Sequence, residues 1–213
     1  MMLALVMTAW TQGAIVTYTS DADYFIHDGP AFFPQSFEVS GLTDPIAEIR
    51  VSFLGLTHET PGDIDALLVG PGGQTVVLMS DAGEPALSPE VTDLQINFHD
   101  GAPLMPQTQK LVSGSYAPTN YVGFGEIPEM DQATPTPPPL GPYGTTFSVF
   151  NGSNPNGTWT LYIQDDRDDD SGVLSGWSLT ITTVPEPSSG ILLTLGVVGL
   201  ATRARASRKA FTR

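Results

Sequence analysis

The 213-residue chain has no cysteine, which excludes disulfides, zinc–thiolate sites and thiol nucleophiles. Basic residues are also scarce, with 8 Lys and Arg against 23 Asp and Glu and a formal net charge of −15. Arg50, Lys110 and Arg167 are the only basic residues before position 190, so the body of the chain is strongly acidic. Because such a body repels phosphate groups, we expect no nucleic-acid partner.

The residues of hydrolytic catalysis are missing as well. A protease needs an activated nucleophile and a base, usually histidine, within reach of each other. The chain contains 3 histidines and no Gly-x-Ser-x-Gly nucleophile elbow. His58 stands just before a turn at Pro61 and Gly62, where a buried hydrogen bond to the loop is its ordinary role. We therefore predict that this protein is not an enzyme.

Apolar residues at helical spacing are absent from the body, where short alternating or β-branched runs are separated by Gly, Pro, Asp and Asn. Ile49, Val51 and Phe53 alternate with polar residues, as expected of a strand with one buried face. The run from Gly70 to Gly73 predicts a hairpin turn. This pattern predicts an all-β fold, a jelly-roll-like antiparallel β-sandwich. The predicted strands cover residues 15–19, 37–39, 46–54, 64–69, 75–79, 91–98, 146–150, 158–164 and 177–183.

The chain divides into three predicted parts. Residues 1–13 combine an apolar run with small residues, as at the end of a secretory signal peptide, although no basic residue precedes the run. We interpret them as a truncated signal peptide, and the alternative is a first strand. Residues 14–183 are predicted to form the β-sandwich, and residues 184–213 a C-terminal sorting and anchoring tail.

The tail has three elements in a fixed order. Pro185, Glu186 and Pro187 come first, and an apolar run over residues 190–201 follows. This run predicts a short transmembrane helix, below the roughly 20 residues of a permanent span, with its basic flank on the cytoplasmic side. The flanking basic residues are Arg203, Arg205, Arg208 and Lys209.

This order resembles the PEP-CTERM sorting signal of Gram-negative bacteria. In that family an exosortase, a membrane transpeptidase-like enzyme, recognises and cuts the tail. A plain membrane anchor would account for the apolar run and the arginines but not for Pro-Glu-Pro. The resemblance implies an exported protein of the cell envelope or extracellular matrix, which its C-terminus anchors in the inner membrane until processing.

Two longer motifs lie within the predicted sandwich. Residues 57–83 join a histidine, a Gly-Asp-hydrophobic strand and a Pro-Gly turn, whereas residues 156–181 join Gly-x-Trp-x-Leu, an Asp-rich loop, Gly-x-Leu and a Trp strand. Together they resemble the P domain (P/Homo B) found beside the catalytic domain of proprotein convertases. The resemblance implies a jelly-roll-like sandwich without a nucleophile. The matching positions are His58, Gly62, Asp63, Pro71, Gly157, Trp159, Leu161, Gly172, Leu174 and Trp177.

One stretch departs from that pattern. Prolines are concentrated at residues 135–142, which leaves the strand order there open. We interpret residues 123–144 as a long surface loop rather than a domain boundary.

An acidic run in the second motif is the main candidate site. Five carboxylates within six residues repel one another, and a bound hard cation relieves that repulsion. Ca²⁺ accepts about six to eight oxygen ligands in flexible geometry and is the expected cofactor, with a solvated acidic hairpin as the alternative. Asp63 and Asp65 flank Ile64, so we expect them to face the same way as a second, weaker metal candidate. The ligands expected in the main site are Asp165, Asp166, Asp168, Asp169 and Asp170.

These observations favour an exported, non-catalytic module with a structural or binding role and with a surface glycan or protein as its partner. A second hypothesis is an accessory P domain that supports a separately encoded subtilisin-like protease. A third is a carbohydrate-binding jelly roll, whose mark would be exposed Trp or Tyr on one face of a sheet.

Overall fold

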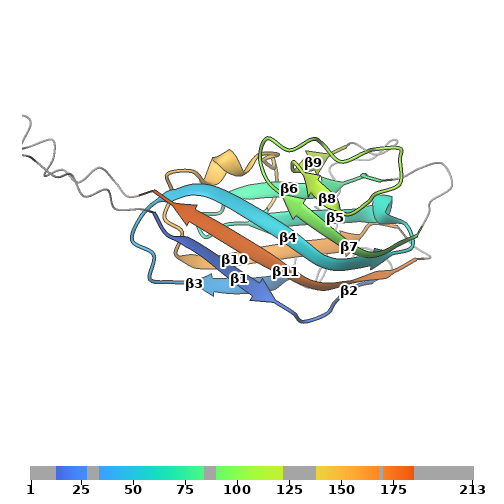
Figure 1. Ribbon diagram of the computed structural model, residues 1–213, viewed down its shortest axis with the longest axis horizontal. Helices are drawn as coiled ribbons and strands as arrows, with labels where there is room; N and C mark the ends of the chain where they lie inside the picture. The colour runs from blue at the N-terminus through green and yellow to red at the C-terminus, as the bar shows by residue number, and fades with distance from the viewer. Residues whose placement is uncertain (1–12, 28–33, 84–89, 122–137, 168–169, 185–213) are drawn as a thin grey trace, which may run out of the picture. The chain divides into compact units, whose positions relative to one another are not determined.

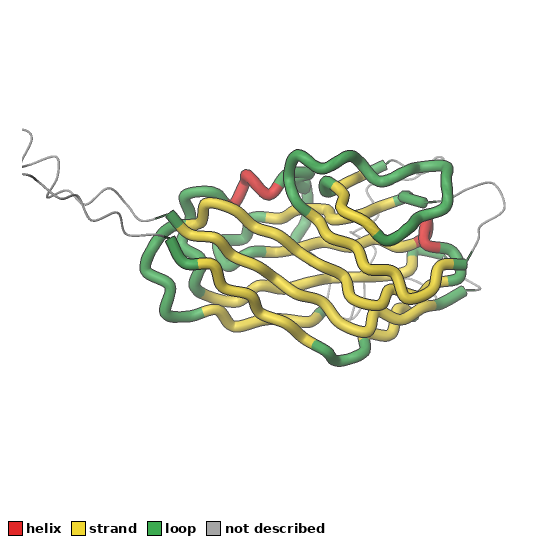
Figure 2. Tube along the Cα trace, viewed as in Figure 1, coloured by secondary structure: helices red, strands yellow, loops and turns green. Residues whose placement is uncertain are grey.

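Two β-sheets packed face to face form the described part of the chain (Figure 1). The computed structural model describes residues 13–27, 34–83, 90–121, 138–167 and 170–184. Strands dominate these residues, and the helical segments among them are short 3₁₀ turns (Figure 2). The all-β sandwich predicted from the sequence is confirmed.

The first sheet has the strand order β1-β11-β4-β7-β8, with β2 also paired to β11. Its strands are β1 (Ile15–Ser20), β2 (Tyr24–Ile26), β4 (Ile46–His58), β7 (Val91–Phe98), β8 (Gly114–Tyr116) and β11 (Gly172–Thr183). The second sheet has the order β3-β10-β5-β6-β9. Its strands are β3 (Gln35–Val39), β5 (Ile64–Val69), β6 (Thr75–Ser80), β9 (Thr119–Asn120) and β10 (Gly157–Asp165).

Two strand pairs run parallel, β7 with β8 and β6 with β9. The sheets are therefore mixed, while the other named strand pairs are antiparallel as predicted. Only Ala117 and Pro118 separate β8 from β9, yet the two strands belong to different sheets. The chain thus adds an edge to each sheet without forming a hairpin.

The core lies between the sheets and is built from alternate residues of the strands. Val51 and Phe53 on β4 are fully buried, as their alternation with polar residues predicted. Trp159 on β10 is fully buried too, packs against Phe150 with ring centroids 4.9 Å apart, and donates its indole N–H to the Pro155 carbonyl. Burying a large apolar side chain of this kind stabilises the fold by about 1.5–3 kcal/mol.

The predicted hairpin turn joins β5 to β6. Gly73 N–H donates to the Gly70 carbonyl at 2.9 Å, and Gly70 N–H donates to the Gln74 carbonyl at 2.9 Å. Gly73 has φ of +81°, a conformation that disfavours residues with a Cβ. The turn therefore depends on glycine at this position.

The strand expected over residues 146–150 is wrong, because Phe147–Phe150 forms the 3₁₀ turn η3. Phe147 and Phe150 are both buried, and a separation of three residues places two side chains on one side of a 3₁₀ turn. The Asp100 carboxylate accepts hydrogen bonds from the N–H groups of Phe147 (2.9 Å) and Ser148 (3.0 Å). A capping residue so distant in sequence is invisible to local pattern reasoning.

The described end of the proline-rich loop covers the outer face of the second sheet. The Gly144 carbonyl accepts a hydrogen bond from Val77 N–H at 2.9 Å, and Gly144 N–H donates to the Thr75 carbonyl at 3.0 Å. Tyr143 packs there against the buried side chains of Leu67 and Val77. The stretch at residues 122–137 lies outside the described residues.

Some predicted features also lie outside the described residues. They are residues 1–12 of the predicted signal peptide (residues 1–13), the C-terminal transmembrane helix, and Pro185, Glu186, Pro187, Arg203 and Arg205. Within the described part of the chain, no helix combines the length and apolar character needed to cross a membrane. The described ends lie side by side, since Thr183 N–H donates to the Ala14 carbonyl at 2.9 Å.

Candidate functional site

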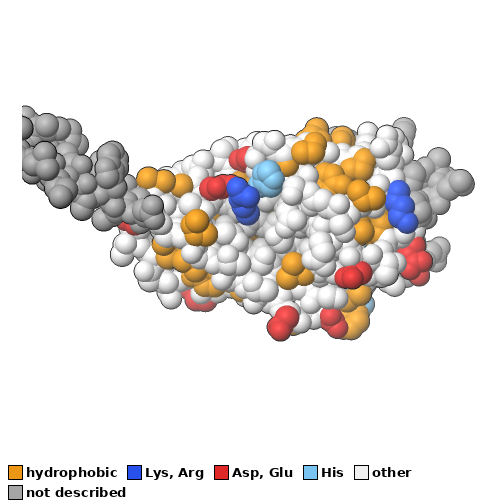
Figure 3. Space-filling view, viewed as in Figure 1, with side chains coloured by type: hydrophobic (Ala, Val, Ile, Leu, Met, Phe, Trp, Pro, Cys, Tyr) orange, Lys and Arg blue, Asp and Glu red, His pale blue; other side chains and the backbone are white. Residues whose placement is uncertain are grey.

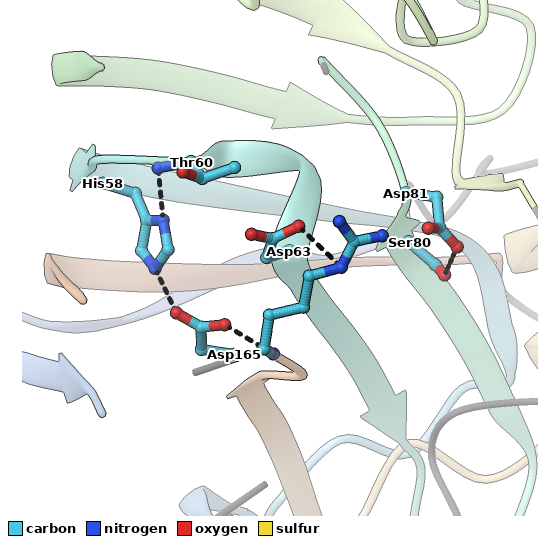
Figure 4. Close-up of polar contacts among 7 residues, drawn as sticks. His58, Thr60, Asp63, Ser80, Asp81 and Asp165 are labelled. Atoms are coloured by element: carbon cyan, nitrogen blue, oxygen red, sulfur yellow. Dashed lines mark hydrogen bonds and ion pairs between the residues drawn. The ribbon is translucent and has the colours of Figure 1, made fainter. Parts of the chain in front are cut away.

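A polar contact between the two sheets closes one end of the sandwich (Figure 4). β4 of the first sheet ends at His58, and β10 of the second sheet ends at Asp165. His58 Nε2 lies 3.2 Å from Asp165 Oδ2, and both side chains are fully buried. Asp165 reaches this position because it continues the inward alternation of Leu161 and Ile163 along β10.

The backbone sets the tautomer of the His58 ring. Thr60 N–H donates a hydrogen bond to His58 Nδ1 at 3.1 Å, so Nδ1 acts as an acceptor and carries no proton. The neutral ring then has its proton on Nε2, the atom that faces Asp165. His58 therefore contacts the loop, as the sequence indicated, and also the opposite sheet, which the sequence did not indicate.

Glycine at the start of β11 makes room for this ring. Gly172 is the cross-strand partner of His58. A Cβ at position 172 would overlap the His58 ring and the Thr57 carbonyl. The glycine of the second sequence motif thus serves the packing of a histidine from the first motif.

The loop after β10 is tied to the start of β5. Asp165 Oδ1 accepts a hydrogen bond from Arg167 N–H at 3.0 Å. Asp166 N–H donates to the Asp63 carbonyl at 2.9 Å, and Arg167 Nε lies 3.4 Å from Asp63 Oδ1. The basic side chain of the acidic run is therefore directed to Asp63 rather than to Asp165.

Two carboxylates of the acidic run meet beside His58. One oxygen each of Asp165 and Asp170 and one ring nitrogen of His58 all lie within 4.8 Å of one another. Burial raises the pKa of Asp165 above its ordinary value; contacts with His58 and the Arg167 N–H offset part of this rise, and Asp170 adds to it. Bringing a second acid to a buried carboxylate is unfavourable unless a proton or a cation accompanies them.

Several polar atoms of this group lack a hydrogen bond. Asp165 Oδ2, Asp170 Oδ1 and His58 Nε2 are buried, and none has a well-aligned hydrogen-bond partner within the described residues. His58 Nε2 and Asp165 Oδ2 are in contact, but their geometry is poorly aligned for a hydrogen bond. Buried polar atoms are normally satisfied, so such a group indicates a site for a further partner.

The other expected ligands lie elsewhere. Asp63 ends the 3₁₀ turn η1 (Pro61–Asp63), where strand alternation does not apply, and contacts Arg167. Asp65 on β5 accepts a hydrogen bond from the Gln164 side chain at 3.0 Å. The two acids of the weaker candidate therefore have different partners. Of the remaining expected ligands, Asp166 is described but is not in the cluster with His58, and Asp168 and Asp169 lie outside the described residues.

A surface cleft elsewhere on the sandwich has no cluster of charged side chains like the one beside His58. A cleft of about 450 Å³ lies beside Asp100, Leu104 and Tyr121. Asp100 is the charged residue among those that line it, and its carboxylate already accepts two backbone N–H groups of η3. The face drawn in Figure 3 likewise shows scattered hydrophobic side chains and few basic ones.

Two family models match the chain. Residues 141–181 match the proprotein convertase P-domain, a range that contains β10, Asp165 and most of β11. Residues 183–206 match the PEP-CTERM protein-sorting motif. The chain carries a P-domain segment joined to a PEP-CTERM sorting signal. Both resemblances drawn from the sequence are confirmed, and the motif at residues 57–83 lies before the matched P-domain range.

Solved structures of a serine protease from Aeromonas sobria are also similar to the chain. For its complex with a chaperone, the TM-score is 0.42 at 15% identity, over 86% of this chain and 28% of the matched chain. For the protease in a second structure, the TM-score is 0.40 at 16% identity, over 84% of this chain and 28% of the matched chain. The chain thus spans 28% of the length of each solved chain that it matches. No curated protein sequence matches the chain.

The matched families set the general role of the protein. The PEP-CTERM motif marks the chain for export and for sorting to the Gram-negative cell envelope, and it implies an exosortase-type enzyme as processing partner. The P-domain and the PEP-CTERM tail are both non-catalytic modules. The protein is therefore an exported module with a P-domain-like fold and a sorting tail.

Proposed function

We propose that this protein is a non-catalytic module that its C-terminal tail delivers to the cell envelope or extracellular matrix, where it has a structural or binding role. The observation that carries the proposal is the junction between the two family matches. The P-domain match ends at residue 181 and the sorting motif begins at residue 183. β11 ends at Thr183, so the sorting signal follows the last strand of the sandwich without a linker domain.

Because of the position of β11, the tail cannot be sorted separately from the sandwich. β11 pairs with β1, β2 and β4 in the first sheet. A strand with partners on both sides cannot leave the sheet without unfolding it. Sorting the tail therefore sorts the whole folded domain.

The arrangement of His58 supports a non-catalytic role. Its two ring nitrogens face the Thr60 N–H and the Asp165 carboxylate, and the side chain is fully buried. General-base catalysis requires a histidine that reaches a nucleophile and a substrate. A ring enclosed in this way reaches neither.

Localisation in a Gram-negative host that carries an exosortase tests the proposal. The full chain is expected in the envelope or matrix fraction in a form shortened at its C-terminus. Changing Pro185, Glu186 and Pro187 together to alanine should leave a longer, unprocessed form in the inner membrane. Changing Ser188 and Ser189 to alanine, next to the motif, is the matched control and should be processed like the parent protein. An unaltered distribution of the Pro-Glu-Pro variant would contradict the proposal.

The P-domain match favours a second candidate, an accessory domain for a separately encoded subtilisin-like protease. Pull-down from the surface of the parent cell, using the processed sandwich as bait, distinguishes the two. Recovery of such a protease, with increased stability or activity in the complex, favours the accessory role. Recovery of envelope proteins or glycans without a protease favours the structural role.

The burial of the aromatic residues weighs against the carbohydrate-binding hypothesis. Trp159 and Trp177 are 0% and 1% exposed. The tyrosines in the described part of the chain are buried or half-buried. A sheet face with exposed Trp or Tyr, the mark of that function, is therefore not formed by the described residues.

A further inference from the structure

We propose that Asp165 and Asp170 bind a calcium ion at the end of the sandwich, and that His58 orients Asp165 for this role. The site connects the end of β10 to the start of β11 and touches both sheets through His58. It is distinct from the sorting signal, which follows the opposite end of β11.

The first argument is unbalanced charge. Asp165 is fully buried, and the charged side chain grouped with it beside His58 is a second acid, Asp170. Arg167 supplies its backbone N–H to Asp165, whereas its guanidinium lies against Asp63. His58 accepts a hydrogen bond at Nδ1, so its ring is neutral and brings no positive charge. A divalent cation supplies the missing charge.

The second argument is that two buried carboxylate oxygens lack a well-aligned hydrogen-bond donor. Asp165 Oδ2 and Asp170 Oδ1 are buried without a well-aligned hydrogen-bond donor in the described residues. They face the same small space, since they belong to a group of atoms within 4.8 Å of one another. Each carboxylate oxygen has lone pairs that remain available when it also accepts an N–H. Such oxygens are the ligands that Ca²⁺ prefers.

The tautomer of His58 decides between calcium and zinc. A ring that binds a metal through Nε2 carries its proton on Nδ1 and usually donates it to an acceptor. At His58 the reverse holds, because Thr60 presents an N–H to Nδ1. Nε2 therefore carries the proton and is directed toward Asp165. Oxygen atoms are then the only ligands that this group offers to a metal. This ligand set suits Ca²⁺ rather than Zn²⁺.

Thermal unfolding of the full chain in detergent, with metal chelated by EDTA or with 10 mM CaCl₂ or MgCl₂ at matched ionic strength, tests the site. Few protein ligands place the affinity at about 10⁻⁴–10⁻³ M, as in other extracellular calcium modules. Calcium at about 10 mM should then raise Tm by about 3–10 °C. Isothermal titration should give one calcium ion per chain.

Three variants locate the effect. Asp170→Asn should lose the calcium shift and, because it removes a like charge, should melt in EDTA no lower than the parent protein. Asp21→Asn, which removes the same charge from an exposed position, should keep the full shift. His58→Gln should keep a reduced shift, since the glutamine amide also donates an N–H toward Asp165.

Other results would overturn the proposal. They are an absent calcium shift, an equal shift in Asp170→Asn, or binding of Mg²⁺ as strong as that of Ca²⁺. A shift with micromolar ZnCl₂ that His58→Gln abolishes would instead make His58 a metal ligand. That outcome would show that the Thr60–His58 contact breaks when metal binds.

Discussion

The His58 ring lies against Gly172, its partner across β4 and β11, in space that any larger residue at position 172 would fill. This contact is what allows the histidine of the first sheet to reach Asp165 of the second. The end of the sandwich therefore depends on residues from three separate parts of the sequence. Substitutions at each of these three positions should change the free energy of unfolding of the whole domain.

Gly172→Ala should destabilise the protein by about 1–3 kcal/mol, because the new Cβ overlaps the ring and the Thr57 carbonyl. Chemical denaturation of the parent and variant proteins measures the difference. Gly101→Ala is a suitable control: a Cβ there meets nothing within 4 Å, but φ is +82°. That variant has a backbone cost of about 1 kcal/mol from its positive φ and no packing cost, whereas Gly172 has no positive φ and its variant has the packing cost alone. A Gly172→Ala protein as stable as the parent would show that the His58 ring and the Thr57 carbonyl move aside freely.

His58→Ala should cost about 2–4 kcal/mol, since it removes buried packing and leaves Asp165 without its neighbour. Exposed His27 provides the comparison, and His27→Ala should change stability by less than about 0.5 kcal/mol. Urea denaturation followed by tryptophan fluorescence reports both values, because Trp159 and Trp177 are buried in the core. A loss at His58 no larger than at His27 would mean that the inter-sheet contact contributes nothing to stability.

Most of the longer strands can be predicted from hydrophobic periodicity and turn residues in this sequence. The strand over residues 64–69 and the strand over residues 91–98 were predicted at their observed limits, β5 and β7. Both runs are apolar or alternating and end at turn residues. β2, β8 and β9 were not predicted, because runs of two or three residues carry no measurable period. The parallel pairings of β8 and β9 depend on tertiary contacts and leave no trace in local sequence.

The candidate site, like the fold, is only partly predictable from the sequence. The acidic run was recognised from its charge density, and Asp165 and Asp170 do meet in the fold. The role of His58 beside them was not predictable, since 107 positions separate His58 from Asp165 and no local pattern joins them. Asp63 and Asp65 were expected to face the same way because they flank Ile64. Because Asp63 instead closes a 3₁₀ turn, the alternation rule did not apply to it.

Asp100 should contribute about 1 kcal/mol through the cap that it provides to η3. Its carboxylate accepts the N–H groups of Phe147 and Ser148 from a position 47 residues earlier in the chain. Asp100→Ala should lose this contribution, whereas Asp100→Asn should keep part of it because the amide oxygen still accepts. Denaturation midpoints of the three proteins give the comparison. Identical stability of the alanine and asparagine variants would show that the cap is not a hydrogen-bond effect.

The raised pKa of Asp165 predicts a specific pH dependence in the absence of calcium. Burial and Asp170 raise this pKa, so the folded protein holds the Asp165 proton more tightly than the unfolded chain does. The resulting stabilisation is complete below the unfolded pKa of about 3.9 and is lost as the pH rises through the folded value. In Asp165→Asn the side chain is neutral at every pH, so this loss is removed.

We therefore expect the parent protein in EDTA to lose stability relative to Asp165→Asn as the pH rises from 4 toward 7, with a slope of at most about 1.4 kcal/mol per pH unit. His58 and Asp170 face the same carboxyl, so the comparison is repeated in the His58→Gln background to isolate the contribution of Asp165. Calcium binds the ionised carboxylate and should reverse the trend above the folded pKa in the parent protein only. Free energies of unfolding from urea titrations at each pH provide the test. Parallel curves for the two proteins in EDTA would show that Asp165 keeps its ordinary pKa in the fold.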